Sequence, residues 1–119
     1  MQESILKNKS YAFALETIKA SKFLVANKKE FTLSKQILRS GTAIGALIRE
    51  AEFGQSRADF VNKMSIALKE ANETLYWLEL LRDSEDIKEL NFELLRKKCD
   101  ELVAMLVATV KTAKGEVRS

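Results

Sequence analysis

Histidine and proline are absent from this chain of 119 residues, and cysteine occurs once, as Cys99. Without histidine, a serine or cysteine nucleophile lacks its usual imidazole base. Without proline, and with only four glycines, the chain has little material for turns and favours helix. A single cysteine excludes a disulfide within the chain and fits a reducing compartment. These absences favour an all-α protein without nucleophilic catalysis.

Long apolar runs are also missing. No segment approaches the roughly 20 uninterrupted apolar residues that span a bilayer, and the first residues, MQESILKNKS, lack the apolar stretch of a secretory signal. We therefore expect a cytoplasmic protein without a membrane partner. The 20 basic and 17 acidic residues give a net charge of only +3, which does not by itself identify a nucleic-acid binder.

Four runs of apolar residues at helical spacing predict helices over approximately residues 3–27, 33–53, 57–82 and 92–114. In chain order the apolar residues are Ile5, Tyr11, Ala14, Leu15, Ile18 and Val25; Ile37, Ile44, Ile48 and Ala51; Phe60, Met64, Ala67, Ala71, Leu75 and Leu78; and Leu95, Cys99, Leu102, Leu106, Val110 and Ala113. Short connections imply antiparallel neighbours. The sequence predicts one domain over residues 1–119, an up-down-up-down four-helix bundle.

Polar residues and glycines mark the expected helix ends. Thr32, Ser56 and Asn91 stand where an N-cap side chain can accept from the exposed amides of the first turn. Gly54 and Gly115 stand where a residue in the left-handed conformation can close a helix. We expect the second and third helices to form a tight hairpin between Gly54 and Ser56.

The predicted third helix carries apolar residues that the core cannot use. Ile66 and Trp77 lie nearly opposite its main stripe, with Leu80 beside them. Single exposed or half-covered hydrophobic residues are normal, so this strip is either an ordinary surface or an oligomer interface. Because bundles with two apolar faces commonly self-assemble, we favour a homo-oligomer.

A dinuclear metal site is the main catalytic alternative, because such bundles can hold one. Glu70 and Glu73 have suitable spacing and Glu50 lies on the adjacent helix, but the imidazole ligands of that site are lacking. Lys63 and Lys69 flank the pair, which favours solvated ion pairs. Cys99 lies on an apolar stripe and is expected in the core. We therefore expect no enzyme activity, no cofactor and no metal.

Gly41 and Gly45 do not form a phosphate loop, because no Gly-Lys-Ser/Thr follows and no strand precedes them. Both flank the core face of the second helix. Each glycine costs about 1 kcal/mol relative to alanine inside a helix, so a compensating contact is expected. We predict that they form a packing notch in which a neighbouring helix approaches closely, with no small-molecule substrate.

Basic residues on the second and third helices are candidates for nucleic-acid contact. They are Arg39, Arg49, Arg57, Lys63 and Lys69. Scattered basic residues are usually a solvated surface, but a ring of subunits would multiply a weak patch into a band. The aromatic residues are few and mostly at core spacing, so base stacking is not expected and backbone phosphates are the predicted target.

The run SGTAIGALIREAEFGQSRADFVNKMSIALKEANETLYWLELL, from Ser40 to Leu81, closely resembles a known family, and the upstream LSKQILRS also fits. It is similar to the bacterial four-helix bundle proteins encoded in intervening sequences of large-subunit (23S) ribosomal RNA genes, often labelled putative ribosomal proteins. The same family includes the accessory variability determinant proteins of diversity-generating retroelements. The resemblance implies a barrel-like homopentamer, and for the retroelement branch it implies binding to nucleic acid and to a reverse transcriptase through basic residues.

Two positions depart from the family pattern in the second helix, which resembles Ser-Ile-Gly-Ala-Asn-Val/Ile-Arg-Glu-Ala. Ala43 replaces the serine and Leu47 replaces the asparagine, so this margin loses polarity. Arg39 and Arg49 stay available for phosphate or for a subunit contact. The residues predict a non-enzymatic, homo-oligomeric bundle, which the resemblance implies is a pentamer, and it is expected to bind RNA, another nucleic acid or a nucleic-acid enzyme. The alternative is an oligomeric protein-interaction scaffold with no nucleic-acid affinity.

Overall fold

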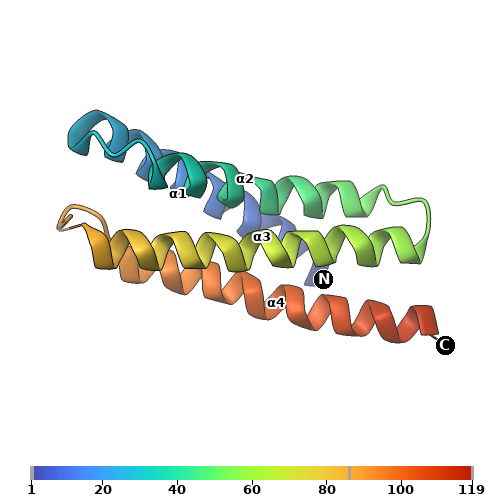
Figure 1. Cartoon of the computed structure of the whole chain (residues 1–119). Coiled ribbons are helices and arrows are strands. Elements are labelled where there is room, and N and C mark those ends of the chain that lie inside the picture. Colours follow the sequence, from blue (N-terminus) through green and yellow to red (C-terminus); the bar gives the residue numbers. More distant parts are fainter. Residues whose placement is uncertain (1, 86, 119) are drawn as a thin grey trace.

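A computed structural model describes residues 2–85 and 87–118, with side chains for residues 5–85 and 87–115. This part of the chain contains four α-helices and no strand: α1 (Gln2–Lys28), α2 (Leu33–Glu52), α3 (Arg57–Ser84) and α4 (Phe92–Arg118). The helices lie side by side in a molecule of 51 × 22 × 20 Å, and their connections alternate between its two ends (Figure 1). The all-helical fold with four helices is confirmed.

The core is formed by the apolar stripes predicted for the last three helices. Ile37, Ile44 and Ile48 of α2 are at most 1 % exposed, and the other stripe residues of α2, α3 and α4 are buried or packed against this core. Phe60 and Leu75 belong to the second group, since they are only partly buried. Helical spacing therefore identified the buried faces of α2 to α4 correctly.

The buried face of α1 differs from the predicted one. Of the predicted stripe, Ile5, Tyr11, Leu15 and Val25 are exposed. The helix instead buries a face that mixes apolar with small hydroxyl residues: Leu6, Ser10, Phe13, Thr17, Ala20, Ser21 and Leu24. The prediction was wrong because these hydroxyl side chains are satisfied, by their own helix for Ser10 and Thr17 and by Ser34 for Ser21. They therefore pack like small apolar residues and leave no apolar signal.

Two of the three predicted N-caps are confirmed. The Ser56 side chain accepts from the amide of Asp59 at 3.0 Å, and the Asp59 carboxylate in turn accepts from the amide of Gln55 at 3.2 Å. At the start of α4, Asn91 Oδ1 accepts from the amide of Leu94 at 3.0 Å. Each cap satisfies an amide that the first helical turn leaves without a partner.

The predicted cap at Thr32 is wrong. Thr32 has helical dihedral angles, φ −89° and ψ −62°, and its side chain makes no capping hydrogen bond. Glu30 takes this role, because its Oε1 accepts from the amide of Ser34 at 2.8 Å. A carboxylate is favourable there, since it lies near the positive end of the helix dipole.

The glycine terminators also behave differently from the prediction. Neither Gly54 nor Gly115 has a positive φ, and α4 continues past Gly115 to Arg118. The α2 helix closes through the amides of Phe53 and Gly54, which donate to Glu50 and Ala51. A Cβ at Gly54 would lie 3.2 Å from the Ala51 carbonyl oxygen, so the tight turn itself favours glycine there.

Small residues line the contact between α1 and α2. A Cβ built on Gly41 would lie 2.7 Å from Thr17 Cγ2, and one on Gly45 would lie 3.4 Å from Ser10 Oγ. The buried hydroxyls of Ser10 and Thr17 donate to carbonyls three residues earlier in α1. The two helices therefore approach closely without leaving a buried hydroxyl unsatisfied.

Replacing Gly41 by alanine tests this contact. Alanine usually stabilises a helix by about 1 kcal/mol relative to glycine, but here its methyl group would overlap Thr17. We expect Gly41→Ala to lower the free energy of urea unfolding by about 1 kcal/mol or more, and added Thr17→Ser to recover part of the loss. Gly115→Ala is the control, because nothing lies within 4 Å of its Cβ, and it should not destabilise. Equal effects at both glycines would contradict the account.

Candidate nucleic-acid interface

Arg39 connects α2 to two carboxylates on α3. Its guanidinium lies 3.3 Å from Glu70 Oε1 and 2.6 Å from Glu73 Oε1. The hydrogen bond to Glu70 is the main cause that raises the pKa of Arg39 above its ordinary value. Trp77 Nε1 also donates to Glu73, at 3.3 Å. Two carboxylates thus compensate the charge of Arg39, which makes this arginine a weak candidate for phosphate binding.

The other four predicted basic residues have different surroundings. Lys63 Nζ lies 3.2 Å from Glu50 Oε1, and the Arg57 guanidinium lies over the Phe60 ring, 5.0 Å from its centroid. Arg49 and Lys69 are exposed, and neither forms an ion pair with another side chain of residues 5–85 and 87–115. Of the five predicted basic residues, only Arg49 and Lys63 line the same cleft.

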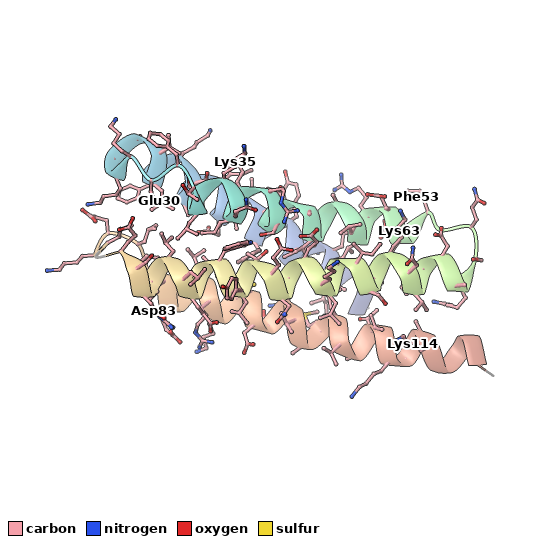
Figure 2. The ribbon with its side chains drawn as sticks, in the orientation of Figure 1. Glu30, Lys35, Phe53, Lys63, Asp83 and Lys114 are labelled. Carbon is pink, nitrogen blue, oxygen red and sulfur yellow. The ribbon has the colours of Figure 1, made fainter. Side chains whose placement is uncertain are left out.

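This cleft, which we call the α1/α2 cleft, has a volume of about 780 Å³ and continues to the start of α3. Its lining combines small residues, two aromatic rings and three cations: Ser10, Ala14, Gly45 and Ala46; Tyr11 and Phe53; and Lys7, Arg49 and Lys63. Phe53 and Lys63 lie near the end where α2 turns into α3 (Figure 2). Glu50 and Asp59 also line it, so cations exceed carboxylates by one.

The two aromatic residues of the cleft were not predicted from the sequence. Tyr11 was assigned to the core stripe of the first helix, yet its side chain is 58 % exposed. Phe53 follows the last apolar position of α2 and is 79 % exposed. The signal for Phe53 was its place outside the helical periodicity. The expectation that aromatic residues lie mostly at core positions therefore fails at this cleft.

The strip on α3 that we predicted as an oligomer interface is unevenly exposed. Ile66 is 37 % exposed, whereas Trp77 and Leu80 are partly buried. Trp77 packs against the core, and the exposed Tyr76 ring meets it edge-on with centroids 5.2 Å apart. On the neighbouring α2 margin, Leu47 also packs against the core. Self-association through this strip stays a prediction.

Cys99 lies in the core, as the sequence predicted. Its side chain is fully buried, and Sγ donates to the carbonyl oxygen of Ala71 at 3.2 Å. Burial raises the pKa of the thiol to about 12.

Among the described residues, no group of three or more acidic or cysteine side chains is placed to hold a metal ion, and no helix is long and apolar enough to cross a membrane.

Comparison with protein families gives a match over nearly the whole chain. Residues 2–108 match the family described as 23S rRNA-intervening sequence protein. The chain belongs to this family. The four helices therefore represent the family's fold, and the resemblance inferred from Ser40–Leu81 is confirmed. Comparison with curated proteins gives no match.

A solved structure of the same family supports the assignment. It is the crystal structure of a protein of unknown function from the S23 ribosomal protein family of Bacteroides thetaiotaomicron VPI-5482. The two sequences are 53 % identical, and the TM-score is 0.89. The alignment covers 93 % of this chain and 99 % of the other. The family fold thus accounts for this chain from α1 into α4.

The buried thiol gives a testable prediction. Because the thiolate is the reactive form and burial raises the pKa of Cys99 to about 12, the folded protein at pH 8 should react with a disulfide reagent at least about a hundredfold more slowly than the urea-unfolded protein. Since the folded pKa is the higher one, stability should fall as pH rises from about 9 toward 12. Equal rates for folded and unfolded protein would show that Cys99 is accessible.

Proposed function

We propose that this protein is a non-enzymatic, cytoplasmic RNA-binding protein: an antiparallel up-down-up-down bundle that assembles into a pentameric ring. The observation that carries the proposal is Arg49, an exposed guanidinium in the α1/α2 cleft that has no carboxylate partner among the described residues. The family description, which refers to an intervening sequence of 23S rRNA, makes RNA the first nucleic acid to test.

Ring assembly supports RNA binding because it repeats each cation around the particle. A chain with a net charge of +3 has a weak field by itself, but five copies can form a continuous basic band. A closed ring joins two different surfaces of each subunit. The proposed surfaces are the strip of Ile66, Trp77 and Leu80 on α3 and the exposed apolar residues of α1 and α2 away from the cleft. The large ones are Ile5, Leu15, Val25 and Leu38.

A second candidate is an oligomeric scaffold that binds only protein. It is favoured by the ion pairs that hold Arg39 against Glu70 and Glu73 and Lys63 against Glu50. These pairs leave fewer uncompensated cations than the sequence suggested. The two candidates differ in one measurable property, which is affinity for nucleic acid at low salt.

Charge reversal tests RNA binding. We expect the double variant Arg49→Glu and Lys69→Glu to bind a labelled RNA at least about tenfold more weakly at low salt. The two carboxylates would repel the phosphates that the cations neutralise with release of counterions. The affinity of the unaltered protein should fall steeply with salt for RNA and DNA. Arg39→Glu should matter less, since Arg39 already pairs with carboxylates. Lys97→Glu, an exposed position on α4, is the control.

Two results would contradict this proposal. Retained RNA affinity in the Arg49/Lys69 double variant would exclude the basic-surface mode. No measurable affinity of the unaltered protein for RNA or DNA at low salt, together with a protein partner that binds in a defined ratio, would favour the scaffold.

The interface strip has its own test. Trp77→Glu introduces a charge beside Glu73 on the proposed contact, so we expect light scattering to report smaller particles while circular dichroism stays helical. Lys97→Glu changes an exposed position on α4 and should leave the mass unchanged. An unchanged mass for Trp77→Glu would place the subunit contact elsewhere.

A further inference from the structure

The α1/α2 cleft owes its shape to small side chains between larger walls. A Cβ added at Gly45 would reach van der Waals contact with Ser10, 3.4 Å from its hydroxyl oxygen, and Ala14 and Ala46 add only methyl groups. The cleft volume of about 780 Å³ lies within the range of small-molecule sites, about 300–1,000 Å³. A flat ring is the kind of group that fits a shallow space lined by small residues.

The exposed aromatic rings of Tyr11 and Phe53 lie on different elements of this cleft. Tyr11 belongs to α1, and Phe53 directly follows α2. More than half of each residue is exposed, 58 % of Tyr11 and 79 % of Phe53. Aromatic rings at an open site offer stacking surfaces for nucleobases, whatever the base identity.

Two basic side chains, Lys7 and Arg49, lie near Tyr11. Lys7, Asn8, Tyr11 and Arg49 line a smaller hollow that shares three of its residues with the cleft. Lys7 Nζ pairs with Glu52 at 3.0 Å, but this pair is exposed and such pairs contribute little to stability. An incoming phosphate can therefore compete for Lys7, and Arg49 is available without breaking a pair with a described residue. An aromatic ring can stack on a nucleobase while the neighbouring cations bind the phosphate of the same nucleotide.

We propose that the α1/α2 cleft binds one nucleotide unit of single-stranded RNA, with the base on Tyr11 and Phe53 and the adjoining phosphate at Lys7 and Arg49. This inference rests on the proposed RNA-binding function and adds its binding mode. A base held in a duplex is already stacked and cannot enter the cleft, so unpaired RNA is selected. Binding therefore depends on aromatic residues as well as on charge.

Binding of a fluorescein-labelled single-stranded RNA of twelve nucleotides to the full chain tests the proposal. Tyr11→Ala and Phe53→Ala should each weaken binding at least about tenfold, whereas Tyr11→Phe should keep the affinity because the ring is retained. Tyr76→Ala is the matched control, since Tyr76 is an exposed aromatic residue on α3 that does not line the cleft. A duplex of the same sequence should bind at least about tenfold more weakly.

The outcomes separate this inference from the function on which it rests. If the unaltered protein binds RNA but Tyr11→Ala and Phe53→Ala bind equally well, the cleft is not the site and RNA binding stands. If the unaltered protein binds no RNA, both are overturned. If these two variants change the particle mass in light scattering instead of the affinity per assembled particle, the cleft is a subunit or protein contact. Equal affinity for the duplex would overturn the selection of unpaired bases.

Discussion

The contact between α1 and α2 has no room for a Cβ atom at Gly41, where Thr17 fills the space. This constraint determines which face of α1 points inward, because the helix that meets α2 through Ser10 and Thr17 must bury Phe13 and Leu24 beside them. On the other side of α1, Tyr11, Leu15 and Val25 therefore stay exposed. Farther along the same helix contact, Ser10 and Gly45 line the α1/α2 cleft. Packing between α1 and α2 therefore also shapes the surface beside it.

The fold was largely predictable from the sequence, and the exception has a physical reason. In α2, α3 and α4 the buried faces are dominated by apolar side chains, so helical spacing reports them directly. In α1 the buried face includes Ser10, Thr17 and Ser21, whose hydroxyls are satisfied locally or by the Ser34 carbonyl oxygen. Apolar spacing in the sequence therefore does not identify a buried face that contains hydroxyl residues. The caps at Ser56 and Asn91 depend on local chemistry and were predicted, whereas the Glu30 cap depends on a loop conformation.

The candidate site was predictable only as a set of residue types. Basic residues on α2 and α3 were evident in the sequence, but the pairing of Arg39 with Glu70 and Glu73 depends on the register between two helices. That register decides which cations are paired with carboxylates. Arg49 is not paired with a described side chain and lines the α1/α2 cleft. Tyr11 and Phe53 could not be assigned to one cleft in advance, because the apolar pattern of α1 placed Tyr11 in the core, whereas the structure exposes it. Family membership supplies the fold and an RNA-related name, while the cleft supplies a specific chemistry to examine.

Photochemical crosslinking tests the central claim, that the α1/α2 contact creates a surface for unpaired RNA, most directly. A single-stranded RNA containing 4-thiouridine would be irradiated with the intact protein, and the attached residues would be located by mass spectrometry of the peptides. The dominant crosslinks should fall on Tyr11 or Phe53, and an excess of unlabelled single-stranded RNA should suppress them. Dominant crosslinks on α4, or on Lys69 and its neighbours without any at the cleft, would contradict it.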